Sequence, residues 1–140
     1  MTVRGATAED LAAIAAIQEA SPEASQWEPA SYLDYECSVV TGGRRVLGFL
    51  VVRQIAADER EILNLAVDPA ERGRGVARKL LESELRRAKT RWFLEVRESN
   101  AAARRFYESL GFRLAGRREN YYQTLSDGSP EGAIVMTFFS

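Results

Sequence analysis

The segment AVDPAERGRGVARKLL, residues 66–81, joins the end of an apolar strand to the start of a helix. Asp68 and Pro69 predict a turn after the strand. Apolar residues spaced three and four apart predict an amphipathic helix from Gly75 to about Thr90. The first backbone N–H groups of a helix lack partners within it, and the helix dipole is positive at that end. The segment therefore predicts an anion site at a strand–turn–helix junction.

Glycines and cationic side chains are concentrated in this turn. Gly73 and Gly75 lack the Cβ atoms that would hold a phosphate away from the backbone. Four side chains add positive charge suited to a polyphosphate: Arg72, Arg74, Arg78 and Lys79. The alternative is a helix whose glycines merely ease a tight turn. A dinucleotide-binding fingerprint would need glycine at position 78, where this chain has Arg78. The chain also has no segment that matches the P-loop pattern.

Composition argues against several classes of chemistry. The 140 residues include no histidine and one cysteine, Cys37, so we expect neither a metal site nor Ser-His-Asp catalysis. One cysteine forms no intrachain disulfide, which favours a reducing cytoplasm. With neither a signal-peptide pattern nor an apolar run of about 18 residues, the expected location is cytoplasmic, without membrane contact. The length predicts one domain, residues 1–140.

The formal net charge of −1 hides an uneven distribution. Residues 1–71 carry 5 Lys/Arg and 12 Asp/Glu, whereas residues 72–140 carry 14 and 8. This asymmetry favours an anionic ligand near the second half and a cationic one near the first, although scattered solvated charge gives the same counts. Because the basic groups cluster at the turn and the pI is about 5.6, we expect no nucleic-acid partner.

Strand and helix patterns alternate through the chain. Helices are expected over about 8–20, near Pro29, over 75–90 and over 100–110, the last with Ser99 or Asn100 as N-cap and Gly111 as its stop. A hairpin over 36–56 turns at Gly42-Gly43. The other expected strands are 2–6, 60–67, 91–97, 113–118 and 133–139. This order predicts an α/β fold, a mixed central sheet of about six to seven strands flanked by helices.

The pattern Arg72-x-x-Gly75-x-Ala77 resembles the signature of the GCN5-related N-acetyltransferases (GNATs), which bind the pyrophosphate of acetyl-CoA. The segments LNLAVDPAERGRGVARKLL, FLEVRESNAAARRFYESLGF, RRENYY and SDG are similar, in order and spacing, to the bacterial RimI-type members. Those enzymes acetylate the N-terminal alanine of a small-subunit ribosomal protein. The resemblance covers residues 60–140 closely and the N-terminal part loosely, apart from Trp27.

The resemblance implies a GNAT fold in which two neighbouring parallel strands splay apart and hold acetyl-CoA between them. Here these would be the strand ending at Val67 and the strand containing Glu95. The backbone of the first would pair with the pantetheine arm through Leu65, Ala66 and Val67. The turn would cradle the pyrophosphate with Arg72, Gly73, Arg74, Gly75, Val76, Ala77 and Arg78. Asn100 matches a family cofactor contact, and a role as helix cap is equally open.

The resemblance also matches Glu95 to the general base and Tyr107 to the acid that protonates the CoA thiolate. From the residues alone, Glu95 would instead pair with Arg97 or another arginine, or face outward, and Tyr107 would pack in the core. Direct attack by the amine is expected, since no histidine activates Cys37. A single glutamate suits an α-amine of pKa about 8 better than a lysine of about 10.4.

The expected function is therefore acetyl transfer from acetyl-CoA to the N-terminal alanine of a ribosomal protein, which would be the partner. The alternatives are a GNAT enzyme acting on a small-molecule amine or a lysine, and a non-catalytic acetyl-CoA-binding module. The presence of both Glu95 and Tyr107 disfavours the module. Four aromatic residues are candidates for the acceptor side or for simple packing: Trp27, Tyr32, Tyr121 and Tyr122.

Overall fold

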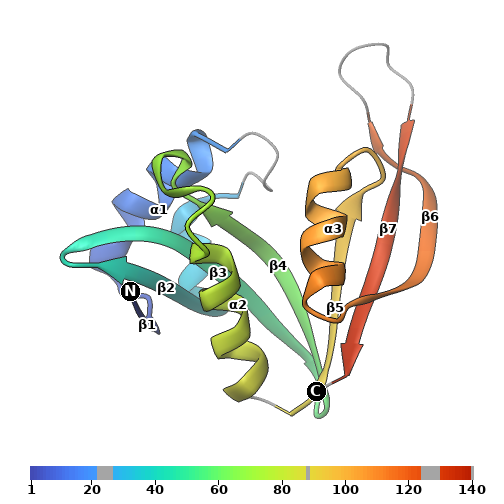
Figure 1. Cartoon of the computed structure of the whole chain (residues 1–140), viewed down its shortest axis with the longest axis horizontal. Coiled ribbons are helices and arrows are strands. Elements are labelled where there is room, and N and C mark those ends of the chain that lie inside the picture. Colours follow the sequence, from blue (N-terminus) through green and yellow to red (C-terminus); the bar gives the residue numbers. More distant parts are fainter. Residues whose placement is uncertain (22–26, 88, 124–129, 140) are drawn as a thin grey trace.

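The computed structural model describes residues 1–21, 27–87, 89–123 and 130–139, with the side chains of 119–123, 130 and 131 left out. In these ranges one sheet has the strand order β1-β2-β3-β4-β5-β7-β6 (Figure 1). Only β4 and β5 pair in parallel, so the predicted mixed sheet is confirmed. The strands are β1 (Thr2–Gly5), β2 (Glu36–Gly42), β3 (Arg45–Ala56), β4 (Glu59–Val67), β5 (Arg91–Arg97), β6 (Arg113–Gln123) and β7 (Pro130–Phe139).

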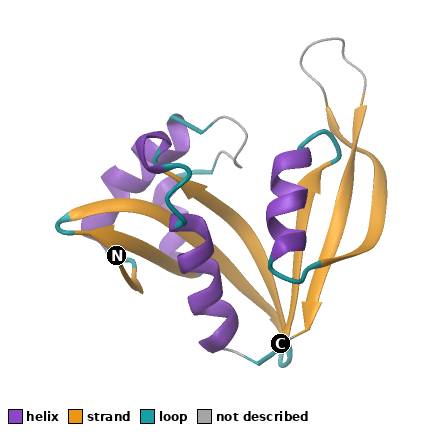
Figure 2. Ribbon diagram, viewed as in Figure 1, coloured by secondary structure: helices purple, strands orange, loops and turns teal. Residues whose placement is uncertain are grey.

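Helices cover both faces of the sheet. The α-helices are α1 (Leu11–Glu19), α2 (Val76–Arg87) and α3 (Ala101–Ser109), and the 3₁₀ helices are η1 (Ala8–Asp10), η2 (Pro29–Asp34) and η3 (Pro69–Glu71). Helices α2 and α3 lie on the same face, in front of the strands in Figure 2, while α1 and η2 pack on the opposite face of β3 and its neighbours. This layering of helices on both faces of a mixed sheet confirms the predicted α/β architecture.

Each face has its own apolar core. On the α2/α3 face, the inward residues Trp92, Leu94 and Val96 of β5 pack with the apolar stripe of α2. On the α1 face, Ile14 packs with Tyr32 and with β2 and β3. Burying each large side chain contributes about 1.5–3 kcal/mol. Strand β3 is buried on both sides, which explains its continuous apolar run VLGFLVV.

The parallel strands β4 and β5 pair over only half their length. Their register runs from Glu59–Arg91 to Ile62–Leu94 and stops there. Beyond that point β4 stays paired with β3, and β5 stays paired with β7 to its end. We call the unpaired ends, residues 63–67 of β4 and 95–97 of β5, the splay. Figure 1 shows the two strands diverging toward their carboxyl ends.

A bulge at Leu63 explains where the splay begins. In the β3–β4 ladder Val52 pairs with Ile62 and Val51 pairs with Asn64, so Leu63 is the extra residue. A β-bulge bends its strand and increases the local twist. Because the bulge directly follows Ile62, the last residue of β4 paired with β5, we infer that it turns β4 away from its parallel neighbour.

Several predicted boundaries were wrong by a few residues. Helix α2 ends at Arg87 rather than near Thr90, because the chain must turn so that the N–H of Arg91 can bond to the carbonyl of Asp58, 2.9 Å away. Strands β6 and β7 are longer than predicted because their pairing continues to Gln123–Pro130. No helix in the described ranges is long and apolar enough to cross a membrane.

Candidate active site

The turn between β4 and α2 is held rigidly at its first residues. The Asp68 carboxylate accepts a hydrogen bond from the N–H of Ala70 at 3.0 Å and pairs with Arg45 at 2.5 Å. These two contacts, the backbone bond first, hold the pKa of Asp68 below its usual value. The N–H of Asp68 also bonds to the carbonyl of Leu47 at 2.8 Å. The start of the predicted anion site is therefore anchored to β3.

The two glycines of the turn adopt a backbone that other residues avoid. Gly73 has φ +81° and Gly75 has φ +77°, in the left-handed region that favours glycine. A Cβ added at either position would meet no atom within 4 Å. The protein itself leaves this surface open, so the glycines are required by the path of the backbone rather than by crowding. That path leads directly into the first turn of α2.

The cations of the turn connect it to both neighbouring helices. Arg72 is exposed, and its guanidinium lies 3.3 Å from the hydroxyl of Ser21 at the end of α1. Arg78 donates a 2.6 Å bond to Ser109 of α3 and pairs with Glu82. Two of the predicted pyrophosphate residues differ in setting from the rest: Val76 is buried in the core and Ala77 is half-buried. Arg74 is exposed and pairs with Glu71.

The predicted pantetheine strand lies at the splay. Leu65 and Val67 pack partly buried against the core of the α2/α3 face, whereas Ala66 is buried in the core of the α1 face. Alternation of this kind is the ordinary pattern of a strand. The backbone edge of these three residues that faces β5 lies beyond the last β4–β5 pair. An extended ligand arm is the kind of group that fits such an edge.

Glu95 lies on β5 at the start of the splay. Trp92, Leu94 and Val96 face the α2/α3 core, so the alternation of the strand directs Glu95 to the opposite face. Its side chain is 17% exposed and pairs with Arg118 of β6, with 3.2 Å between Nη2 and Oε1. Burial raises the pKa of Glu95 above the usual glutamate value, Arg118 lowers it, and Glu61 adds to the rise.

Tyr107 lies on the face of the sheet opposite to Glu95. It belongs to α3, is 8% exposed and packs edge-on against Phe106 and Phe112. Burial raises the pKa of its phenol well above the usual value, so the hydroxyl keeps its proton at neutral pH. The packing role expected from spacing is present.

Asn100 and Cys37 have structural settings. The Asn100 side chain accepts a 3.1 Å bond from the N–H of Ala103 and thereby caps α3, so Asn100 and not Ser99 is the N-cap. Cys37 is half-buried on β2, and burial raises the pKa of its thiol to about 11. A thiol that stays protonated is a poor nucleophile, which agrees with the expectation of direct amine attack.

A buried polar network holds the segment before β2 against the splay. The Tyr32 hydroxyl donates to Oε1 of Gln18 in α1 and accepts a 3.0 Å bond from Asn64, the β4 residue after the bulge. The amide of Gln18 donates to the carbonyl of Trp27 at 2.6 Å. Trp27 stacks on Tyr32 and meets Tyr35 edge-on. This network joins α1, η2 and β4.

Tyr32 therefore belongs to the core, since it is fully buried. Trp27 is partly exposed and remains a candidate for the acceptor side. The side chains of Tyr121 and Tyr122 lie outside the described part of the structure. Sequence patterns did not identify Gln18, Asn64 or Arg118, because each contact joins elements that are distant along the chain.

Comparison with known proteins places this geometry in a family. The model of the acetyltransferase (GNAT) family matches residues 8–112. The chain is a member of this family. The GNAT fold predicted from the sequence is thus confirmed, together with its mixed sheet and its diverging parallel strands.

Two relatives are informative. A [ribosomal protein bS18]-alanine N-acetyltransferase of Haemophilus ducreyi is 43% identical over 91 residues, which cover 61% of this chain and 61% of that protein. The protein of the same name from Escherichia coli K12 is 44% identical over 110 residues, 75% of this chain and 70% of that one. The matched region thus spans between about three fifths and seven tenths of these relatives' length.

Solved GNAT structures superimpose on nearly the whole chain. The crystal structure of the Escherichia coli ribosomal-protein-S18-alanine N-acetyltransferase has a TM-score of 0.83 at 34% identity, covering 99% of this chain and 92% of that one. The structure of Ard1 from Thermoplasma volcanium has a TM-score of 0.84 at 31% identity, covering 99% and 96%.

Replacing Gly75 by alanine should weaken acetyl-CoA binding about 5- to 30-fold. An L-residue in the left-handed region costs about 1–2 kcal/mol, and the loop must keep this conformation to present its N–H groups. Titration calorimetry with acetyl-CoA measures the effect. Gly5→Ala is the matched control, because Gly5 has no positive φ and nothing lies within 4 Å of its added Cβ. Equal affinities of the two variants would contradict the assigned role of the loop.

Replacing Tyr32 by phenylalanine should destabilise the protein by about 1–3 kcal/mol. The change removes only the hydroxyl and leaves the buried groups of Gln18 and Asn64 without their shared partner. Urea unfolding measures the free energy. Tyr35→Phe, in the same aromatic cluster, should change the stability by less than about 0.5 kcal/mol. If both variants have the same free energy of unfolding as the wild type, the Tyr32 hydrogen bonds do not contribute to stability.

Proposed function

We propose that the chain is an acetyl-CoA-dependent N-acetyltransferase that acetylates the N-terminal alanine of a ribosomal protein. The observation that carries the proposal is the splay, with Glu95 on one face of the sheet and Tyr107 on the other. The names of the relatives at 43% and 44% identity support the acceptor. The net charge of −7 over residues 1–71, from 5 Lys/Arg and 12 Asp/Glu, supports a cationic acceptor peptide.

The residues present fit acetyl-CoA. The N–H groups and arginines around Gly73 and Gly75 suit a pyrophosphate, and the open backbone edge of Leu65–Val67 suits the amides of a pantetheine arm. When bound there, acetyl-CoA supplies an acetyl group as a thioester that an amine attacks directly. We also assign Asn100 to the cofactor side, since its cap holds the start of α3 beside the splay.

Two side chains move the protons of this reaction. The carboxylate of Glu95 accepts the proton that the acceptor nitrogen loses as its bond to the acetyl carbon forms. The C–S bond breaks, and the Tyr107 hydroxyl donates a proton to the leaving sulfur. Because the two side chains lie on opposite faces of the sheet, the acceptor and the cofactor approach from different sides. The raised pKa of Glu95 suits a base, since the carboxylate binds a proton more readily. Tyr107 carries its proton at neutral pH, so the hydroxyl is present to donate it.

Mass spectrometry of acetylated products tests the proposal. The protein and acetyl-CoA are incubated with a basic peptide that begins with alanine, with the same peptide N-terminally blocked but containing lysine, and with a pool of small amines. The expected result is one acetyl group on the alanine nitrogen, with transfer by the Glu95→Gln variant slowed about 10²- to 10⁴-fold. Labelling confined to lysine or to a small amine would move the function to another acceptor. Cofactor binding without any transfer would indicate a binding module.

A further inference from the structure

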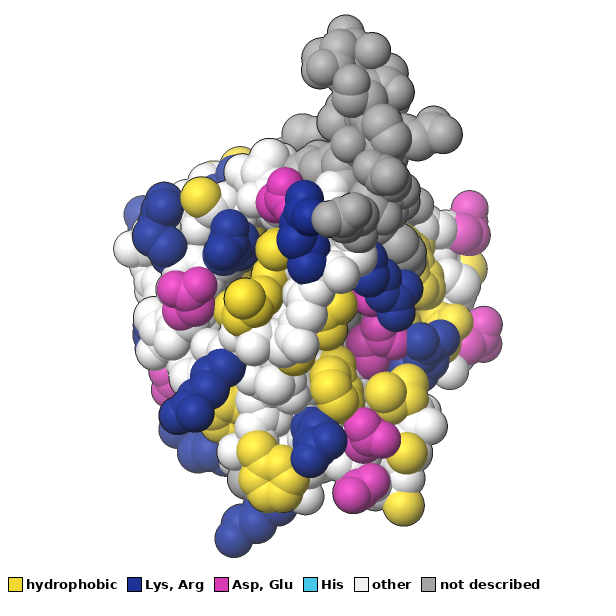
Figure 3. Space-filling model, turned by 90° about the vertical axis from the view of Figure 1, so that its right-hand side faces the viewer, with side chains coloured by type: hydrophobic (Ala, Val, Ile, Leu, Met, Phe, Trp, Pro, Cys, Tyr) yellow, Lys and Arg dark blue, Asp and Glu magenta, His cyan; other side chains and the backbone are white. Residues whose placement is uncertain are grey.

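An arginine from outside the parallel strands reaches the candidate base. Arg118 lies on β6, which is separated from β5 by β7. Its guanidinium nevertheless lies 3.2 Å from Oε1 of Glu95. The β7 residue that pairs with both Arg97 and Arg118 is Ala133, whose methyl group lets a long side chain cross the strand. Figure 3 shows this side of the molecule, with arginines lying directly beside carboxylates.

The position of Arg118 on its face follows from the register. Glu95 pairs with Val135, and Val135 pairs with Gly116. Gly116 and Arg118 are two residues apart, so both lie on the face that carries Glu95. Gly116 has no side chain, and a Cβ added there would meet nothing within 4 Å. The side chain of Arg118 therefore crosses β7 on the face that carries Ala133 and Val135.

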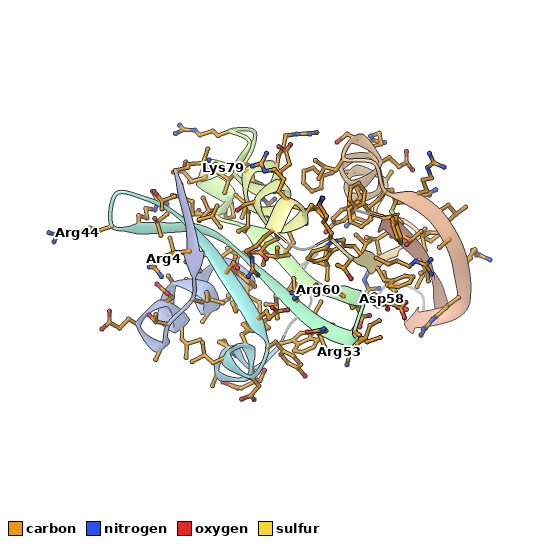
Figure 4. The ribbon with its side chains drawn as sticks, turned by 90° about the horizontal axis from the view of Figure 1, so that it is seen from below. Arg4, Arg44, Arg53, Asp58, Arg60 and Lys79 are labelled. Atoms are coloured by element: carbon orange, nitrogen blue, oxygen red, sulfur yellow. The ribbon has the colours of Figure 1, made fainter. Side chains whose placement is uncertain are left out.

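Other charged groups lie on the strands around Glu95, among them Arg97, two residues along β5 on the same face. Glu61 of β4 pairs with Phe93 of β5, which lies two residues before Glu95 and on the same face. The negative charge of Glu61 opposes ionisation of Glu95. Arg53 of β3 binds Glu61 (Figure 4 labels Arg53). Arg117, adjacent to Arg118 in the chain, binds Glu98. Among the interactions that shift the pKa of Glu95, burial and Glu61 raise it and Arg118 lowers it.

We propose that Arg118 is a positioning residue that holds the Glu95 carboxylate as an oriented anion at the mouth of the splay. An ion pair through Oε1 leaves the second carboxylate oxygen to accept the proton of the acceptor amine. The pairing also restricts the side-chain torsions of Glu95. This role rests on the proposed function of Glu95 as the base, and Arg118 itself touches neither substrate nor cofactor.

Direct titration of Glu95 tests the pairing without relying on activity. In protein labelled with ¹³C at the glutamate carboxyl carbons, the Glu95 signal is assigned by its loss in Glu95→Gln. In Arg118→Gln the titration midpoint of Glu95 should rise by about 0.5–1 pH unit, since the lost partner is partly exposed. In Arg118→Lys, which keeps the positive charge, the titration midpoint of Glu95 should stay close to that of the wild type. Arg117→Gln is the matched control and should leave the midpoint unchanged. An identical midpoint in Arg118→Gln and the wild type overturns the proposal.

Kinetics then tests whether the pairing serves the reaction. With one alanine peptide, kcat/KM of Arg118→Gln should fall more at pH 6 than at pH 9, because fewer Glu95 side chains are ionised at the lower pH. In the Glu95→Gln background, Arg118→Gln should cause no further loss. A loss of equal size at every pH and in both backgrounds would show that Arg118 acts elsewhere, for example on the acceptor.

The two proposals fail in distinguishable ways. If Glu95→Gln keeps full turnover, the assignment of the base is wrong, while the carboxyl titration still decides whether Arg118 controls Glu95. If Glu95→Gln is strongly slowed but the titration of Glu95 is unaffected by Arg118→Gln, the base stands and the positioning role is wrong. Thermal unfolding of each variant, with Arg118→Lys as the conservative change, separates these results from a loss of fold.

Discussion

Replacing Glu95 by glutamine should lower kcat about 10²- to 10⁴-fold, the range typical for loss of a general base. Glutamine keeps the size of the side chain but cannot accept a proton, and its amide can still contact Arg118 across 3.2 Å. The loss should therefore be confined to the chemical step. Steady-state transfer to an alanine peptide measures kcat, and a coupled assay of free CoA thiol follows the other product.

Binding of acetyl-CoA provides the control for this variant. Glu95 lies on the face opposite to α2 and α3, away from the turn that is assigned to the pyrophosphate, so the dissociation constant should stay within about twofold of the wild type. A Glu95→Gln protein that turns over within about threefold of the wild-type rate would remove Glu95 from the mechanism. Equal loss of binding and turnover would instead indicate a structural role.

Replacing Tyr107 by phenylalanine should lower kcat about 10²-fold or more. The hydroxyl that protonates the leaving thiolate is lost, while the ring keeps its edge-on contacts with Phe106 and Phe112. Because burial raises the pKa of the Tyr107 phenol, the wild-type acid stays protonated across neutral and mildly basic pH. The alkaline limb of its pH–rate profile should therefore not come from Tyr107.

The melting temperature separates catalysis from packing in this variant. Phenylalanine fills the same volume in the core of the α2/α3 face, so we expect the Tyr107→Phe protein to melt within a few degrees of the wild type. Full turnover by Tyr107→Phe would mean that water or another group protonates the sulfur, and Tyr107 would then be a core residue alone.

Local patterns were sufficient to predict the central elements of the fold. The segment RWFLEVR forms β5 at the predicted residues, and Gly111 ends α3 with φ +103°. The positive φ of Gly73 and Gly75 agrees with the predicted special turn. These features depend on neighbours in the chain, such as alternation, caps and glycine conformations. The hairpin turn was predicted one residue too early, since Gly42 still belongs to β2 and the turn lies between Gly42 and Arg45, with positive φ at Gly43.

These local patterns could not predict contacts between residues that lie on different strands and far apart in the sequence. The bulge at Leu63 depends on the register between β3 and β4, and nothing in the apolar sequence around it differs from an ordinary strand. Arg118 reaches Glu95 because β7 inserts between β5 and β6, an order that consecutive pairing does not predict. The sequence left open whether an arginine would pair with Glu95, and the strand order identifies Arg118 as such a partner.

The short pairing between β4 and β5, which we call the seam, also affects how readily the protein is degraded by proteases. Four residue pairs join the antiparallel strands β1–β4 to the group formed by β5, β6 and β7, so the two groups are held together largely by the apolar core beneath α2 and α3. A ligand that binds only the folded state stabilises it in proportion to the logarithm of its concentration. Proteases cleave chains that open, so a ligand that contacts both β4 and β5 would slow degradation of the protein.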